Sequence, residues 1–250
     1  MPPTSQAVSL FIPCLVDQVY PEIGLAMAKV LRRLGLRLQY EPAQTCCGQP
    51  AFNSGYREQA RQVAAHFLKI FCGAEALVAP SGSCVAMVRN FYPSLFVGHP
   101  LHEPAKQLAQ RTFEFSEFLV KQLGIVDVGA AYACQAGFHN SCHSLRELRL
   151  LEEPLALLRH VRGLDLLVPA GEPVCCGFGG LFALTFETIS AAMTRSRLEA
   201  FEKMEVQAVI SNDPGCVMQL RQEAKALGSR LEILHLAELL DKAPAPNLTS

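Results

Sequence analysis

Cysteine residues recur in two matching sets along this chain of 250 residues. The first set is Cys14, Cys46, Cys47 and Cys84, and the second set is Cys142, Cys175, Cys176 and Cys216. The intervals of 31 and 36 intervening residues in the first set become 32 and 39 in the second. Because cysteine is a rare residue, four matches at an offset of 128 to 132 residues indicate duplication of one thiol-bearing unit.

Four thiolates in a reducing compartment are suited to an iron–sulfur cluster or to a tetrahedral zinc ion. Structural zinc sites usually take their ligands from C-x2-4-C knuckles, and neither set contains one. Dispersed ligands therefore favour a cluster, while zinc and metal-free thiol chemistry stay open as alternatives. A disulfide within an adjacent pair is disfavoured, because it would be strained and would leave the outer cysteines unexplained.

Charge and hydropathy exclude several classes of protein. Residues 1–124 carry 11 basic and 8 acidic side chains, and residues 125–250 carry 11 basic and 15 acidic ones. Neither half has the basic excess of a nucleic-acid-binding protein, so no nucleic acid is expected as a partner. The sequence has no signal-peptide pattern at its start and no apolar run long enough to span a bilayer. These features predict a cytoplasmic protein, which could reach a membrane surface only through partner proteins.

The same order of strands and helices is predicted in both halves, from runs of apolar residues and from helical spacing. In the first half, strands are expected at 8–12, 36–40 and 76–79, and helices at 22–34 and 56–71. In the second half, strands are expected at 130–138, 164–169 and 208–211, and helices at 150–161 and 189–202. Alternating strands and helices indicate an α/β fold with two pseudo-symmetric lobes, each a small parallel sheet flanked by helices.

The expected domains are residues 1–124 and 125–242, with 243–250 as a disordered tail. A late echo between residues 116–119 and 237–240 has an offset of only 121, which indicates an extra loop in the first half near residues 93–104.

The predicted fold also explains why distant cysteines should meet. In each half they follow the ends of three successive strands, and the carboxyl ends of parallel strands share one edge of a sheet. Neighbouring residues of a strand point to opposite faces, so an adjacent pair can reach one ligand only from a turn. Gly48 and Pro50 in the first half, and Gly177 in the second, permit such a turn.

These motifs resemble the cysteine-rich CCG domain family, which includes the B component of heterodisulfide reductase and the iron–sulfur subunits of glycolate oxidase and anaerobic glycerol-3-phosphate dehydrogenase. The chain is similar above all to the lactate-utilisation protein A branch of this family. The segments that carry the resemblance are FIPCLVDQVYPEIG, TCCGQPAFNSG, PSGSC, HNSCHSLRELR, CCGFGGLFAL and NDPGC. The chain has no ferredoxin-like C-x2-C-x2-C-x3-C-P run, which favours this stand-alone branch.

The resemblance implies an iron–sulfur electron-transfer subunit of a complex that oxidises L-lactate to pyruvate. It implies a ferredoxin-domain-containing lactate-utilisation protein B and a protein C as partners, together with an electron carrier. It also implies one iron–sulfur cluster per half, with zinc in one half as the alternative, because some family members place zinc in such a motif. The rival functions are a zinc-stabilised scaffold subunit and a thiol–disulfide oxidoreductase of the heterodisulfide reductase type. No catalytic residue is identified.

The sequence departs from the heterodisulfide reductase pattern at two positions. Domains of that kind end each motif in CxxC, whereas Ser81 and Asp213 stand here in place of its first cysteine. Each half therefore offers four thiolates, and this favours an ordinary four-cysteine 4Fe-4S cluster over the non-cubane form.

Other polar residues near the cysteines are candidates for supporting contacts. His143 is a candidate nitrogen ligand or hydrogen-bond partner of the ligands. Arg146 is a candidate donor to cluster sulfur or to a substrate carboxylate, with a solvated position on a helix as the alternative. Asp213 is a candidate hydrogen-bond acceptor or metal ligand, with a turn role before Pro214 as the alternative. His139, also close to Cys142, is either a similar candidate or a plain loop residue. Cys72 and Cys134 lack a counterpart in the other half and are interpreted as buried apolar filler.

Overall fold

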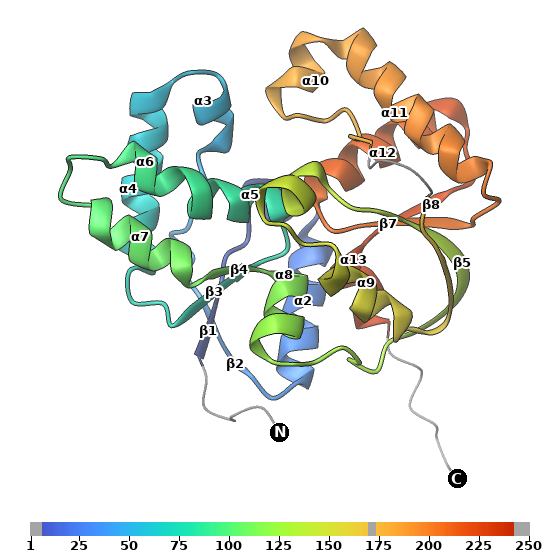
Figure 1. Ribbon diagram of the computed structural model, residues 1–250, viewed down its shortest axis with the longest axis horizontal. Coiled ribbons are helices and arrows are strands. Elements are labelled where there is room, and N and C mark those ends of the chain that lie inside the picture. Colours follow the sequence, from blue (N-terminus) through green and yellow to red (C-terminus); the bar gives the residue numbers. More distant parts are fainter. Residues whose placement is uncertain (1–6, 170–173, 243–250) are drawn as a thin grey trace.

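The computed structural model describes residues 7–169 and 174–242, and it places the two halves of the chain side by side (Figure 1). The disordered tail that the sequence predicts at 243–250 lies outside the described residues. Between the halves, residues 124–130 form neither helix nor strand. The boundary near residue 124 stays a prediction.

Each half contains one four-stranded parallel sheet, in the orders β2-β1-β3-β4 and β6-β5-β7-β8. The strands of the first sheet are β1 (Ala7–Leu10), β2 (Arg37–Tyr40), β3 (Ala76–Ala79) and β4 (Thr112–Glu114). The strands of the second sheet are β5 (Ala131–His139), β6 (Arg162–Leu167), β7 (Ala208–Ser211) and β8 (Glu232–His235). Central strands β3 and β7 are wholly buried, as expected for parallel strands covered on both faces. The predicted α/β class with two pseudo-symmetric lobes is confirmed.

Helices fill the connections between these strands. In the first half they are α1 (Cys14–Gln18), α2 (Pro21–Arg33), α3 (Gln49–Asn53), α4 (Arg57–Phe71), α5 (Gly82–Ala86), α6 (Tyr92–Leu95), α7 (His102–Gln110) and α8 (Phe115–Glu117), with π-helical turns η1 (Met87–Phe91) and η2 (Phe118–Gln122). In the second half they are η3 (His143–Glu147), α9 (Glu152–Arg159), α10 (Leu181–Thr185), α11 (Glu187–Glu202), α12 (Pro214–Leu227) and α13 (Leu236–Asp241).

The two lobes share a hydrophobic core. Helix α13 of the second half packs on α2 of the first half, and α8 of the first half packs on α9 of the second. One continuous core cluster accordingly contains residues from both halves, such as Val30 and Phe118 together with Leu157 and Leu239. Because each half covers part of the other, burial of apolar surface holds the lobes in a fixed relation.

The fourth strand of each sheet is absent from the sequence prediction. Strands β4 (TFE) and β8 (EILH) mix polar with apolar residues, so they lack the apolar run that marks β3 (ALVA) and β7 (AVIS). The echo at 116–119 and 237–240 marks the helical turns that follow these strands. The extra segment that the sequence places near 93–104 spans the end of α6, a connection and the start of α7.

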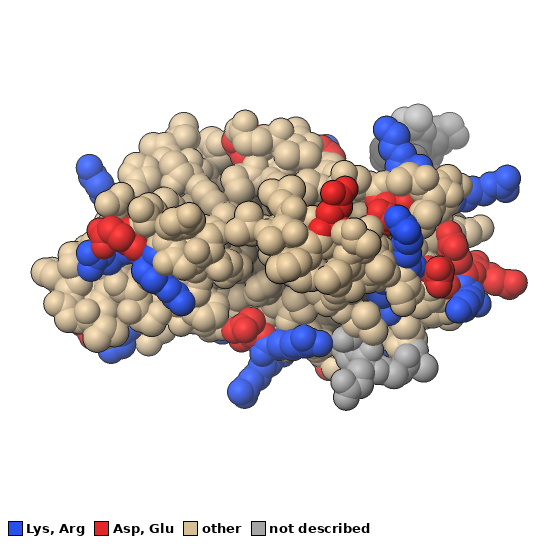
Figure 2. Space-filling view, turned by 90° about the horizontal axis from the view of Figure 1, so that it is seen from above, with Lys and Arg blue, Asp and Glu red and all other residues tan. Residues whose placement is uncertain are grey.

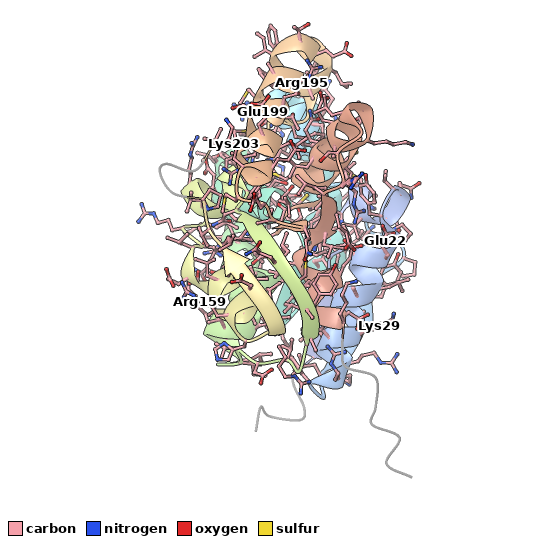
Figure 3. All side chains as sticks on the ribbon, turned by 90° about the vertical axis from the view of Figure 1, so that its right-hand side faces the viewer. Glu22, Lys29, Arg159, Arg195, Glu199 and Lys203 are labelled. Carbon is pink, nitrogen blue, oxygen red and sulfur yellow. The ribbon has the colours of Figure 1, made fainter. Side chains whose placement is uncertain are left out.

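Charged side chains gather at the rim of the face seen in Figure 2, whose centre is largely uncharged. On the flank of the second lobe, Arg195, Glu199 and Lys203 follow one another at four-residue intervals along the exposed side of α11 (Figure 3). Glu22 and Lys29 lie on α2, where they pair with Arg221 at 3.5 Å and with Asp241 at 3.4 Å, respectively. These exposed pairs between the halves contribute little energy, so the shared core carries most of the contact.

Candidate metal centres

The cysteines of each half lie at the carboxyl edge of its sheet, in the turns that lead from strands into helices. Cys14 begins α1 just after β1, and Cys84 lies in the first turn of α5 just after β3. In the second half, Cys142 follows β5 and Cys216 lies in the first turn of α12, just after β7. Parallel strands thus deliver these residues to one edge, as the sequence analysis expected.

In the first half, four sulfur atoms form a connected group, which we call the first quartet (Cys14, Cys46, Cys47 and Cys84). The Cys14 and Cys46 sulfurs are 3.8 Å apart, and the Cys47 and Cys84 sulfurs are 3.4 Å apart. All four cysteines line one pocket, which places the two close pairs side by side. The outer thiol of Cys14 is exposed, whereas Cys47 and Cys84 are buried.

The second half repeats this arrangement in the second quartet (Cys142, Cys175, Cys176 and Cys216). The Cys176 and Cys216 sulfurs are 3.1 Å apart. Cys142 and Cys175 line the same pocket as this pair. The structure therefore brings together all eight cysteines of the duplicated pattern, one quartet per lobe.

Each adjacent pair ends in a left-handed glycine that lets both of its sulfurs face the same side. Gly48 has φ of +82° and Gly177 has φ of +91°, a region that L-residues rarely adopt. The glycine amide then donates to the first sulfur of its pair, from Gly48 to Cys46 at 3.3 Å and from Gly177 to Cys175 at 3.4 Å. The predicted turn role of these glycines is what the backbone shows.

A buried hydroxyl anchors the second cysteine of each pair. Tyr92 donates to the carbonyl of Cys47 at 2.9 Å, and Thr194 donates to the carbonyl of Cys176 at 2.8 Å. Tyr92 and Thr194 come from different helices, so the two halves hold the corresponding carbonyl with different side chains. Such anchors hold the adjacent pair in position before any metal binds.

Hydrogen bonds among the thiols affect which of them ionises most readily. Those from Cys14 and Cys47 lower the pKa of Cys46 to about 3, and those from Cys142 and Cys176 lower the pKa of Cys175 to about 2. The donors Cys14 and Cys142 have raised pKa values, because each keeps its proton to donate a hydrogen bond to this neighbour and is partly buried. In both halves the first cysteine of the pair is therefore the thiol whose ionisation is favoured, and the thiolate is the form that binds metals.

The donor set of each quartet fits a metal centre bound by thiolates. Four sulfurs without a competing carboxylate among them match zinc or an iron–sulfur cluster, and not a hard cation. A tetrahedral ion with metal–sulfur bonds of roughly 2.3 Å needs sulfurs about 3.8 Å apart. The Cys14–Cys46 separation of 3.8 Å meets this spacing, whereas the closer contacts of 3.4 and 3.1 Å must widen around any metal.

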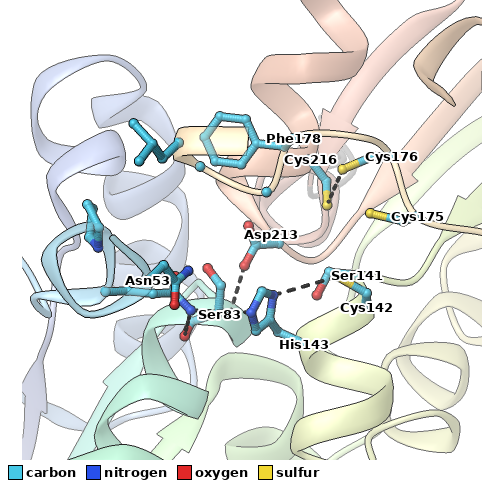
Figure 4. Close-up of a pocket in the computed structure, with 15 residues that line it drawn as sticks. Asn53, Ser83, Ser141, Cys142, His143, Cys175, Cys176, Phe178, Asp213 and Cys216 are labelled. Carbon is cyan, nitrogen blue, oxygen red and sulfur yellow. Dashed lines mark hydrogen bonds between the residues drawn. The ribbon is translucent and has the colours of Figure 1, made fainter. Parts of the chain in front are cut away.

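Both quartets face the boundary between the lobes. A pocket of about 140 Å³ lies beside the first quartet and one of about 60 Å³ beside the second. The two pockets share four lining residues, Gln49, Pro50, Ser83 and Phe178. Figure 4 shows the second pocket, with the cysteines of its quartet on one side and Asn53 and Ser83 of the first half on the other. Each centre thus has a wall from the opposite lobe.

Ser81 and Asp213, which replace cysteines of the related CxxC pattern, form a hydrogen bond to each other across the lobe boundary. The Ser81 hydroxyl donates to Asp213 Oδ2 at 3.2 Å, and the Ser83 amide donates to the same oxygen at 2.9 Å. Each residue also caps the helix that follows it, since Ser81 accepts from the Cys84 amide and Asp213 from the Gly215 amide. Asp213 also lines the second pocket, while its carboxylate accepts hydrogen bonds from Ser81, Ser83 and Gly215.

The remaining predicted residues lie at different distances from the sulfurs. His143 lines the second pocket, where Nδ1 is 3.7 Å from the Cys142 sulfur and Nε2 is 3.3 Å from the Gln49 amide nitrogen. Arg146 is on the exposed side of η3 and is not among the described residues that line either pocket. The interpretation of Cys72 as buried filler is wrong, because Cys72 ends α4 on the exposed surface. Cys134 is partly buried in β5.

Two residues beside the second quartet are not assigned to the site from the sequence. His139 is buried at the end of β5, and one of its ring nitrogens lies within 4.8 Å of the sulfurs of both Cys176 and Cys216. Arg197, buried on α11, donates to this imidazole at 3.2 Å. The signal for His139 is its position three residues before Cys142. Arg197 offers no signal, since it is one of several charged residues along α11, such as Arg195 and Glu199.

Comparison with known proteins gives the same division of the chain. The family model described as "Cysteine-rich domain" (CCG) matches residues 8–89 and again residues 136–221. Lactate utilization protein A from Geobacillus kaustophilus is 41% identical over 235 residues, which cover 94% of this chain and 98% of that protein. Lactate utilization protein A 2 from Bacillus cereus strain 03BB102 is 41% identical over 236 residues, with the same two coverages.

Similarity to solved structures is much weaker. A putative Asp/Glu racemase from Yersinia pestis matches 95% of this chain and 96% of its own, with a TM-score of 0.38 and 12% identity. The two regions matched by the family model are those that supply the first and second quartets, and the relatives extend over nearly the full length. This chain therefore belongs to the CCG cysteine-rich domain family and groups there with the lactate utilization A proteins.

Proposed function

We propose that this protein is an electron-transfer subunit in the oxidation of L-lactate to pyruvate, with one iron–sulfur centre held by each quartet. The observation that carries the proposal is the pairing of two four-thiol groups that face one lobe boundary. The names of the relatives, which refer to lactate utilization, support the metabolic part of the proposal.

An iron–sulfur cluster bound by four thiolates supplies reversible one-electron chemistry. The residues of the chain hold and insulate it. Cys47, Cys84, Cys176 and Cys216 are buried, which keeps water from half of each ligand set. The amides of Gly48 and Gly177 donate to sulfur and offset part of the negative charge of the thiolates.

Other proteins must supply the remaining steps. The sequence contains no nucleotide-binding fingerprint of the G-x-G-x-x-G type placed after a strand, so a flavin or nicotinamide centre for lactate is expected elsewhere. We propose that a ferredoxin-domain-containing lactate-utilisation protein B and a protein C are the partners, and that an electron carrier takes up the electrons. No helix in the described part of the chain is long and apolar enough to cross a membrane.

Anaerobic purification tests this proposal directly. Iron and sulfide analysis should find two centres per chain, and electron paramagnetic resonance of the reduced protein should show a cluster signal. Cys47→Ser and Cys176→Ser should each remove one centre. Cys72→Ser, at an exposed cysteine outside both quartets, is the matched control and should leave both. Protein that retains no iron after anaerobic reconstitution would refute the electron-transfer function.

A zinc-stabilised scaffold is the second candidate, and the sulfur spacing favours it in one respect. The Cys14–Cys46 separation of 3.8 Å equals the edge expected of a zinc–thiolate tetrahedron. This candidate predicts stoichiometric zinc, no visible absorbance and no redox signal. Metal analysis of the same anaerobic protein therefore separates the two functions, including a mixed case with zinc in one half.

Thiol–disulfide chemistry is the weaker alternative from the family. It would need a reactive thiolate at an adjacent pair, and the lowered pKa values of Cys46 and Cys175 make these two residues the candidates. Alkylation of metal-free protein tests it, because uniformly slow labelling of both residues would dismiss this function.

A further inference from the structure

The two quartets are backed by side chains of different chemistry. In the first half, Phe11 lies three residues before Cys14 and is fully buried. Its ring packs against Phe67 with centroids 4.7 Å apart, and Phe67 packs against Phe71 at 4.7 Å. The backing of the first quartet is therefore apolar and offers no hydrogen-bond donor from these rings.

The second half keeps this arrangement but replaces two of its three rings. His139 lies three residues before Cys142 and is only 1% exposed. Its Nδ1 accepts from Arg197 Nε at 3.2 Å, and the Arg197 guanidinium lies 4.4 Å from the centre of the Phe201 ring. His139, Arg197 and Phe201 follow Phe11, Phe67 and Phe71 at offsets of 128, 130 and 130 residues.

Arg197 determines which nitrogen of His139 carries a hydrogen. A guanidinium has only donors and stays protonated in proteins, so Nδ1 must present its lone pair to it. Because Nδ1 is the acceptor in this bond, it carries no hydrogen, and the ring is neutral. Its single hydrogen is then on Nε2, and an Nε2 that bears hydrogen cannot be a metal ligand.

That Nε2–H has no partner among the described residues, although it is buried. An unsatisfied buried donor costs about 1–3 kcal/mol, so native structures rarely keep one without a reason. The candidate acceptors belong to the second quartet, because the Cys176 and Cys216 sulfurs lie within 4.8 Å of a ring nitrogen of His139. A metal-bound thiolate is a good acceptor for such a donor.

We propose that His139 donates this Nε2 hydrogen bond to a metal-bound thiolate of the second quartet, and that Arg197 is the positioning residue that fixes the donor tautomer. The hydrogen bond draws negative charge from sulfur, so the second centre accepts an electron more readily than the first. Uptake of that electron moves no proton, since the hydrogen remains on Nε2. This inference rests on the proposed function and gives the two quartets different roles.

Single-centre proteins allow each quartet to be measured alone. Cys46→Ser with Cys84→Ser keeps the second centre, and Cys175→Ser with Cys216→Ser keeps the first. Anaerobically reconstituted protein is titrated electrochemically and followed by electron paramagnetic resonance. In the second-centre protein, His139→Leu should lower the reduced-to-oxidised ratio at a fixed potential roughly tenfold, the size expected from one hydrogen bond to a charged group.

Matched variants separate this role from a structural one. His139→Gln should restore most of the shift, because its amide can accept from Arg197 and donate to sulfur. Arg197→Met should act like His139→Leu, and Phe11→Leu in the first-centre protein should change nothing. Equal titrations for His139→Leu and the unsubstituted second-centre protein would overturn the inference. So would loss of the metal in His139→Leu, since that result would make His139 a ligand.

Cobalt(II) supplies a readout that does not depend on iron–sulfur assembly. In metal-free protein loaded with Co²⁺, His139→Leu should move the thiolate-to-cobalt charge-transfer band to longer wavelength, because the sulfur loses a stabilising hydrogen bond. If Co²⁺ binds and the band stays unchanged, the role of His139 is wrong while the quartets stand. If neither quartet binds Co²⁺, the metal-centre function itself fails.

Discussion

Replacing Gly177 by alanine tests how tightly the second adjacent pair is built. An alanine Cβ at this position would lie 2.6 Å from the carbonyl oxygen of Ser190 and 3.2 Å from Thr194 Oγ1. The Ser190 oxygen belongs to the backbone of α11, so it cannot turn aside as a flexible side chain would. Thr194 is the anchor of the Cys176 carbonyl, so the shift would reach the quartet itself.

Gly48→Ala is the natural comparison, because Gly48 has the same role in the first half. The two glycines have similar φ, +82° and +91°, so the cost of left-handed backbone, about 1–2 kcal/mol, is common to both. The nearest atom to a new Cβ at Gly48 is 3.4 Å away, which is ordinary contact. Overpacking adds roughly 1–3 kcal/mol at Gly177 alone. We therefore expect a total loss of about 2–5 kcal/mol for Gly177→Ala against about 1–2 kcal/mol for Gly48→Ala.

Urea unfolding gives the two free energies, and metal analysis of each variant gives occupancy. Gly177→Ala should lose metal from the second quartet only, because the Gly177 amide that supports Cys175 is displaced. Gly228→Ala is the control for backbone cost alone, since Gly228 has φ of +66° with no atom within 4 Å of a new Cβ. Equal losses for the variants at Gly177 and Gly48 would refute the packing argument.

Further predictions concern other parts of the fold. Burial raises the pKa of Glu114 to about 8 from 4.5, so its contribution to stability is full below about pH 4.5 and is lost as the pH rises through 8. Over that range, urea unfolding should show the wild type losing up to about 5 kcal/mol relative to Glu114→Gln, at about 1.4 kcal/mol per pH unit; parallel curves would contradict this. Asp213→Ala removes a helix cap and the hydrogen bonds to the opposite lobe, and calorimetry should record a loss of about 2 kcal/mol in stability. An unchanged stability would show that the contact between the lobes is incidental. Tyr92→Phe leaves the Cys47 carbonyl without its donor; chelator competition should show weaker metal binding in the first quartet, and an effect on the second quartet would argue against a local anchor. Residues 1–124 expressed alone should show no cooperative melting by circular dichroism, because α13 no longer covers α2; a stable half would disprove the shared core.

Much of the fold follows from patterns that are local in the sequence. The buried strand Ala76–Ala79 and the helix Arg57–Phe71 are predicted within one residue, because apolar runs and helical spacing depend only on neighbours. Strands β4 and β8 escape prediction, because polar residues at their ends leave no continuous apolar run. The interpretation of Cys72 as buried is wrong for a related reason. The type of a residue at the end of a helix does not reveal whether its side chain faces the core or the solvent.

The cysteine quartets show what sequence determines about this protein. Their repeated spacing, and the strand that precedes each outer cysteine, are enough to predict that four sulfurs meet at one sheet edge in each half. The partners across the lobe boundary depend on contacts between distant segments. Neither the Asp213–Ser81 bond nor the shared walls of the two pockets has a sequence signal, because nothing local says how the two sheets face each other. The tautomer of His139 is likewise decided only when folding places Arg197, 58 residues away along the chain, against its ring.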